Sequence, residues 1–154
     1  MAENNTTEET LVTGFCRAWN NLDVSYIESL LCDDIEYSSQ MVLANINGKE
    51  AYVNYLNAKF KAVKEGTDPV KAELGYFDNS PCLILIQQLA TPEHAPYSKR
   101  RLMSDGTIEK VHVYISERVA IILFKFEGNK IKSASMCMVA PNINDVKRTG
   151  IFPT

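Results

Sequence analysis

Residues 15–60 read FCRAWNNLDVSYIESLLCDDIEYSSQMVLANINGKEAYVNYLNAKF, and this stretch decides the fold. Apolar residues recur at helical spacing from position 11 to 22, from 24 to 31 and from 53 to 63. A helix that buries one face repeats its apolar residues every three to four positions. The spacing therefore predicts three helices, over residues 6–21, 23–32 and 48–64.

A change of period within and after this stretch predicts strands. Residues 35–40 alternate, which puts Ile35, Tyr37 and Ser39 on one face. After Pro69 the period of the apolar residues changes from helical to two. Helices followed by hairpin-connected strands indicate the α+β class, with three N-terminal helices packed on a curved antiparallel sheet that encloses a cone.

Three longer segments complete the predicted sheet. Residues 82–89 are apolar almost without interruption, which is typical of a central strand covered on both faces. Residues 107–126 are too many for one average strand, so we expect a break or bulge near Ser116. Residues 90–106 carry two prolines and many charges, and we interpret them as an excursion from the sheet.

Composition excludes several classes of protein. The 154 residues are 45% hydrophobic and 23% charged, which is typical of one globular core. The net charge is -3 and no face is basic, which argues against nucleic acid as a partner. No apolar run approaches the roughly 18 residues of a membrane span, and the polar N-terminus does not resemble a secretory signal. We therefore expect a cytoplasmic protein without a membrane partner. The four cysteines are far apart and no ligand motif is present, so neither a metal nor a cofactor is expected.

Three segments resemble the nuclear-transport-factor-2-like superfamily, in particular its SnoaL-like and ketosteroid-isomerase-like members. They read FCRAWNNLDVSYIESLLCDDIEY at 15–37, NGKEAYVNYL at 47–56 and LFKFEGNKIKSASM at 123–136. The resemblance implies a cystatin-like α+β cone with a pocket between the helices and the concave face of the sheet. It also implies a homodimer packed through the outer sheet face. The apolar central strand supports this contact, because helices cover only one of its sides.

The resemblance covers most of the chain, apart from the 90–106 excursion and the C-terminal end. We therefore expect a single domain over residues 1–154, with residues 1–5 and 141–154 as flexible tails.

The resemblance also places three catalytic positions. In ketosteroid isomerases a tyrosine and a protonated aspartic acid hold the oxyanion, and a second aspartate moves the proton. The tyrosine position falls on Phe15, the base on Ser39 and the oxyanion aspartic acid on or near Ile122. Phenylalanine and isoleucine have no donor, and serine has no useful basicity near neutral pH. Steroid-type isomerisation is therefore not expected.

The candidate ligand-binding residues lie on the inward faces of the predicted elements. The first and third helices supply aromatic rings, and strand alternation supplies hydroxyls and thioethers. Such a pocket favours a small, flat, mostly apolar molecule with one or two oxygens over a phosphorylated one. The candidates are Phe15, Trp19, Tyr37, Ser39, Tyr55, Ile122, Met136 and Met138.

The catalytic candidates are His112 and Tyr114, which share one face of a predicted strand. A histidine and a tyrosine that face a pocket can donate a proton or hold a ligand oxygen. Alternation does not tell whether this face looks into the pocket, at solvent or at a dimer partner. The second histidine, His94, lies in the TPEHAP segment and is expected to be an exposed loop residue.

Three functions stay open at this point. The first is a small-molecule-binding protein with a mostly apolar pocket. The second is an isomerase, dehydratase or hydrolase that acts on a small apolar oxygenated substrate. The third is a protein-interaction module. A pocket with an acid–base group of shifted pKa favours the enzyme, and a pocket filled by its own side chains favours the interaction module.

Overall fold

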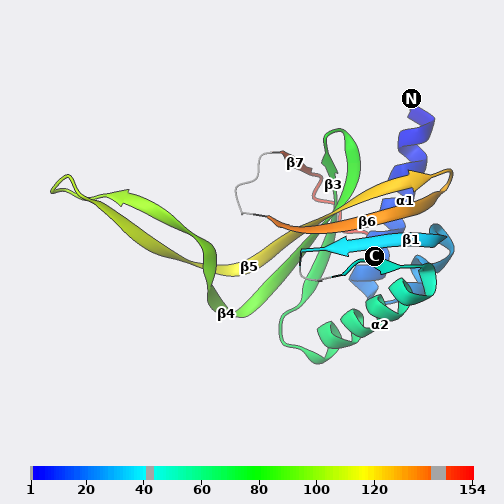
Figure 1. Cartoon of the computed structure of the whole chain (residues 1–154), viewed down its shortest axis with the longest axis horizontal. Coiled ribbons are helices and arrows are strands. Elements are labelled where there is room, and N and C mark those ends of the chain that lie inside the picture. The colour runs from blue at the N-terminus through cyan, green and yellow to red at the C-terminus, as the bar shows by residue number, and fades with distance from the viewer. Residues whose placement is uncertain (1, 41–43, 140–144) are drawn as a thin grey trace.

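A computed structural model of the chain describes residues 2–40, 44–139 and 145–154. It contains a seven-stranded sheet in the order β2-β1-β6-β5-β4-β3-β7 (Figure 1). In chain order the elements are α1 (Ala2–Asn21), the 3₁₀ turns η1 (Val24–Tyr26) and η2 (Glu28–Leu30), β1 (Leu31–Ser39), β2 (Ile46–Asn47), α2 (Lys49–Glu65), β3 (Val70–Phe77), β4 (Ser80–Leu102), β5 (Ile108–Glu127), β6 (Lys130–Val139) and β7 (Val146–Arg148).

Two α-helices form one core with a single face of the sheet. Phe15 of α1, Tyr52 and Phe60 of α2, and Ile122 of β5 belong to the same buried cluster. Each large apolar side chain buried in this way stabilises the fold by about 1.5–3 kcal/mol. α1 and α2 therefore confirm the first and third helices that the apolar spacing predicted.

The predicted arrangement of three N-terminal helices is wrong. Residues 24–30 form two 3₁₀ turns, and α2 follows the first two strands. The apolar residues Val24, Ile27 and Leu30 are three positions apart, which fits the period of a 3₁₀ helix as well as an α-helix. The Asp23 carboxylate accepts a hydrogen bond from the Ser25 N–H at 2.9 Å, which fixes the tight first turn.

The sheet is antiparallel except for one pair of strands. β1 runs parallel to β6, with Tyr37 opposite Ala134 and Ser39 opposite Met136. The predicted all-antiparallel sheet is therefore wrong at this pair. β6 pairs with β5 on one side and with β1 on the other, so it links the N-terminal strands β1 and β2 to the rest of the sheet.

β4 and β5 continue past the sheet as a two-stranded arm, formed by residues 93–102 and 108–115 (Figure 1). Residues 90–106 do leave the body of the sheet, as expected, but most of them are strand. The pairing of β4 with β5 is interrupted between Gln88 and Glu93 and between His94 and Ser98. The first irregularity lies opposite Ser116 and the second opposite Val113, and the extra residues are on β4 in both cases.

The outer face of the sheet carries a second apolar cluster. Cys82, Ile84, Ile86 and Ile121 are 1–6% exposed in the single chain. Val146 packs against this cluster along with partly buried strand residues. The apolar run over residues 82–89 is therefore covered on its outer side by the chain itself. The expected dimer through this face stays a prediction.

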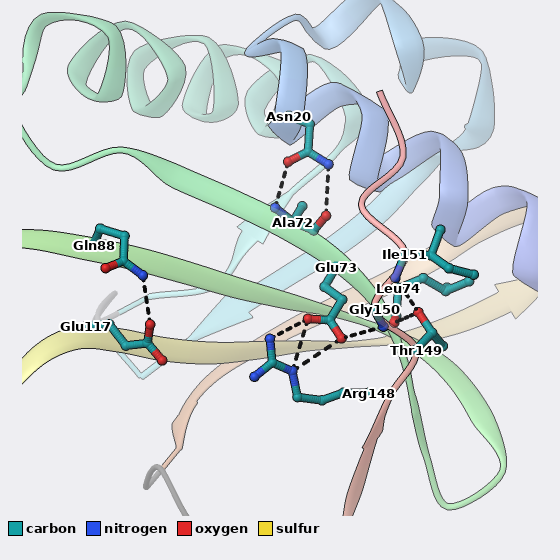
Figure 2. A network of polar contacts seen from close by, with 10 residues as sticks. All are labelled: Asn20, Ala72, Glu73, Leu74, Gln88, Glu117, Arg148, Thr149, Gly150 and Ile151. Carbon is teal, nitrogen blue, oxygen red and sulfur yellow. Dashed lines mark hydrogen bonds and ion pairs between the residues drawn. The ribbon is translucent and has the colours of Figure 1, made fainter.

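The C-terminal end is strapped to the sheet, although residues 141–154 were expected to be a flexible tail. Residues 141–144 lie outside the described ranges, and β7 pairs with β3. Arg148 donates from Nε to Oε1 of the buried Glu73 at 3.0 Å, and the Gly150 N–H donates to Oε2 at 3.1 Å (Figure 2). Asn20 of α1 donates to the carbonyl of Pro153 at 2.6 Å.

The N-terminal end also departs from the expected tail, because residues 2–5 belong to α1. No helix within residues 2–40, 44–139 and 145–154 is long and apolar enough to cross a membrane.

Candidate functional site

The space between α1, α2 and β1 is filled by aromatic side chains. Tyr37 stacks on Tyr52 with ring centroids 4.7 Å apart, and it lies 5.1 Å from the ring of Tyr55. Phe15 also stacks on Tyr52, with ring centroids 6.3 Å apart, and its ring lies 5.0 Å from that of Phe124. Such ring pairs stabilise a core by about 0.5–1.5 kcal/mol each beyond the area that they bury.

Burial controls the ionisation of the tyrosines in this row. It raises the pKa of Tyr52 well above its ordinary value of 10.0, and the neighbouring Tyr37 and Tyr55 raise it further. The pKa of Tyr37 is also raised, first by burial and then by a hydrogen bond with Tyr55. The Tyr37 hydroxyl donates to Sδ of Met136 at 3.9 Å. These two phenols stay neutral near neutral pH and serve as packing groups.

A groove of about 840 Å³ lies between the C-terminal half of α2 and the sheet. This volume is within the roughly 300–1,000 Å³ of small-molecule sites. The lining combines apolar residues of the sheet and small residues near the end of the helix with four charged residues. We call it the α2 groove, and its lining residues are Trp19, Lys59, Ala62, Val63, Gly66, Thr67, Asp68, Val70, Leu85, Gln87, Glu93, His94, Ile115, Arg118, Ala120, Met136 and Met138.

Three of the eight predicted ligand-binding residues line the α2 groove. Trp19 reaches it from α1, and Met136 and Met138 reach it from β6. The two methionines are on the same strand face, as alternation predicted. Thioethers adapt their shape to a ligand more readily than branched side chains do.

The other five predicted residues lie elsewhere. Phe15, Ile122 and Tyr37 are 0%, 1% and 3% exposed and belong to the closed core. Ser39 and Tyr55 are half-buried and do not line the α2 groove. The proposed pocket of the sequence analysis is thus divided, because the aromatic row fills the part nearest β1.

The indole of Trp19 is held by its neighbours but lacks a polar partner. Its ring meets Phe60 edge-on, with centroids 4.9 Å apart. The indole N–H is buried and has no hydrogen-bond partner among the described residues. A buried donor left without a partner costs about 1–3 kcal/mol.

The mouth of the α2 groove is held in place by polar contacts. Arg118 and Glu93 form an ion pair across the base of the arm. The Ala90 N–H donates to the Asp68 carboxylate at 2.9 Å, which ties β4 to the segment after α2. These contacts fix the wall of the groove that the arm provides.

No model of a known protein family matches the sequence, and no curated protein matches it. Solved structures match over most of the chain. A protein of unknown function from Mesorhizobium loti, described as NTF2-like, is 11% identical, with 89% of this chain and 94% of that chain covered and a TM-score of 0.57. The chain has the NTF2-like fold.

Two further solved structures share it. A Kribbella flavida protein, provisionally named a ketosteroid isomerase, is 8% identical, with 91% and 83% coverage and a TM-score of 0.58. A Catenulispora acidiphila protein with a ketosteroid isomerase-like fold, in complex with trimethylamine, is 16% identical, with 82% and 83% coverage and a TM-score of 0.51. These identities show the fold, which hosts many activities.

The two catalytic candidates of the sequence analysis lie on the arm. His112 and Tyr114 are exposed and do not line the α2 groove. Their rings lie 5.5 Å and 4.4 Å from His94, which is the histidine at the groove. His94 is exposed, as expected, but it lies in β4 and not in a loop. Within the described residues, no group of His, Cys, Asp or Glu has an arrangement suited to a metal ion.

Sequence reasoning missed the helix wall of the groove. Lys59, Ala62 and Val63 of α2 recur at helical spacing, and Gly66, which follows the last residue of the helix, continues the spacing. The small side chain of Ala62 and the absence of one at Gly66 leave room beside the sheet. The sequence does show the small residues Ala62 and Gly66 at helical spacing, but only the neighbouring sheet shows that they face an open space.

Proposed function

We propose that the protein binds a small, mostly apolar molecule in the α2 groove. The observation that carries the proposal is a groove of about 840 Å³ whose lining includes the ring of Trp19 and the thioethers of Met136 and Met138. Leu85 and Ala120 add apolar surface to the same space. The trimethylamine complex of the Catenulispora acidiphila protein supports a small-molecule role for this fold.

The lining selects the chemistry of the ligand. A flat ring system with one or two oxygens fits beside the indole ring and the two methionines of the lining. Arg118 is already paired with Glu93, so a phosphate would compete with a carboxylate that is in place. A phosphate would then have Lys59 as its remaining lysine or arginine partner in the lining, so charged molecules are disfavoured by the cost of removing their water.

The enzyme alternative rests on one residue. His94 is the histidine that lines the α2 groove, and Tyr114 lies against its ring. An isomerase, dehydratase or hydrolase would use this imidazole as its acid or base. Loss of turnover in His94→Ala, with ligand binding kept, is the result that would support this alternative over simple binding.

A pair of variants on α2 tests the proposed site. Ala62→Phe puts a ring into the groove from an exposed helix position, and Ala51→Phe puts the same ring about three turns away on the same helix. With 2-naphthol as the probe, calorimetry should show binding to wild type and to Ala51→Phe. Ala62→Phe should bind at least about tenfold more weakly, because overpacking costs about 1–3 kcal/mol.

AMP serves as the charged comparison in the same titrations. Binding of AMP alone, or equal binding of 2-naphthol by both variants, would place the ligand outside the α2 groove and contradict the proposal.

A further inference from the structure

We propose that two copies of the chain pair through the free edge of β5, residues 108–118, to make one continuous sheet from two arms. β5 pairs with β4 from Ile108 to Ile122, but its pairing with β6 starts only at Val119. Among the described residues, no strand lies beside the other edge of residues 108–118. That edge presents backbone N–H and C=O groups that a further strand can pair with.

The two edges of the arm differ in how they are protected. The edge of β4 carries Pro92 and Pro96, two interruptions of pairing, and the cationic run Lys99 to Arg101. Prolines, bulges and charges are the usual means by which proteins keep a free strand edge from pairing. Residues 108–118 of β5 have no proline, and β4 carries the extra residues at both interruptions. The open edge is therefore that of β5.

The sequence of this edge is complementary to itself. Antiparallel pairing about a two-fold axis at Val113 sets Val111 opposite Ile115 of the second copy and His112 opposite Tyr114. Val111, Val113 and Ile115 are half-buried on one face, while His112 and Tyr114 are exposed on the other. Apolar and aromatic cross-strand pairs each stabilise a sheet by about 0.2–1 kcal/mol. A second copy therefore matches this edge on both faces.

One type of like-charge pair arises in this register, and the two-fold axis repeats it at both ends. Glu109 would lie opposite Glu117 of the second copy. Each carboxylate already has a partner within its own chain: Arg101 donates to Glu109 at 3.0 Å, and Gln88 donates to Glu117 at 2.7 Å. These partners reduce the repulsion at the two ends of the paired segment.

The isolated arm also needs support. A two-stranded ribbon is marginally stable in water, whereas three or more strands with an apolar face are stable. Tyr114 is 63% exposed and Ile108 is 65% exposed in the single chain. Nucleic acid is a poorer occupant, since the chain as a whole carries a net charge of -3. Pairing of two arms gives four strands and covers the exposed aromatic residue.

Cysteine crosslinking tests the register directly. Val113→Cys places two thiols opposite one another at the axis, where Cα atoms about 4.5–5.5 Å apart fall within the range of a disulfide. Arg100→Cys, on the protected β4 edge of the same arm, is the matched control. Oxidised Val113→Cys should run mainly as a crosslinked dimer on non-reducing gels. Wild type, with its own four cysteines, and Arg100→Cys should stay uncrosslinked.

Sedimentation equilibrium adds a second, independent readout. Val113→Lys should raise the dimer dissociation constant at least about tenfold, because two lysines then face each other at the axis. Amide exchange over residues 109–117 should slow as wild-type concentration rises. A wild-type monomer at high micromolar concentration, a dimer that Val113→Lys leaves intact, or equal crosslinking of Val113→Cys and Arg100→Cys would each overturn the proposal.

Discussion

Cys16 and Cys82 are buried thiols whose ionisation is opposed by the fold. Burial is the main cause that raises the pKa of Cys16 from 9.0 to about 12 and that of Cys82 to about 11. In the unfolded chain the same thiols ionise near 9.0, so the unfolded state loses protons first as the pH rises. Their contribution to stability is complete below pH 9.0 and is lost as the pH rises towards about 12.

We therefore expect Cys16→Ala to flatten the alkaline loss of stability. The free energy of unfolding, measured by urea titration across this pH window, should fall less steeply for Cys16→Ala than for wild type. Tyr37 and Tyr52, whose pKa values are also raised, keep some slope in the variant. Cys137→Ala, at a half-buried position, is the control. An unchanged slope in Cys16→Ala would contradict the assignment.

The residues at the isomerase positions lead to a second prediction. Phe15 and Ile122 lie in the closed core, and Ser39 is half-buried beside Met136. We expect no double-bond migration when a ketosteroid is incubated with the protein and followed by ultraviolet absorbance. Migration that Ser39→Ala abolishes would show that a base at this position works after all.

At the scale of elements, the C-terminal strap depends on one buried carboxylate. The Glu73 side chain is 1% exposed, and its paired Arg148 is 57% exposed. Arg148→Leu leaves a buried charge without its partner, which should cost on the order of 3 kcal/mol in the free energy of unfolding. The double variant Glu73→Leu, Arg148→Leu removes both charges and should recover part of that loss.

Urea unfolding of the single and double variants measures both effects. Lys147→Leu changes the exposed neighbour in β7 and should stay within about 0.5 kcal/mol of wild type. A double variant less stable than Arg148→Leu would mean that the pair contributes more than the cost of burying its charges.

The elements show what periodicity reveals and where it fails. α1, α2 and the long strands have apolar patterns of one clear period, and these were predictable. Val24, Ile27 and Leu30 fit two helical periods, so their 3₁₀ turns were not predictable. Glu73 carries no local signal, because its partner Arg148 lies 75 positions away in the sequence.

The candidate site was predictable only in part, for a related reason. Met136 and Met138 of β6 and Trp19 of α1, which the alternation and the helical spacing had put on inward faces, line the α2 groove. Whether Phe15 and Tyr37 line a space or fill it depends on how their rings stack with Tyr52. The periodicity of the sequence does not show this stacking.

At the scale of the whole molecule, the groove and the arm are parts of one structure. Glu93, His94 and Ile115 belong to the arm and also line the α2 groove. The Glu93–Arg118 ion pair and the Asp68 contact to β4 hold this shared wall in position. Pairing of two arms and binding of a small molecule can therefore affect one another through the residues that both use.

The most direct test of small-molecule binding in the α2 groove follows the indole N–H of Trp19 by nuclear magnetic resonance. Trp19 is the sole tryptophan of the chain, so a ¹⁵N-labelled sample gives one indole signal that needs no assignment by mutation. Titration with 2-naphthol should move this signal and saturate, because an aromatic ligand in the groove lies against the Trp19 side chain, while AMP should leave it in place. Saturable binding of 2-naphthol with an unmoved indole signal would contradict the central claim.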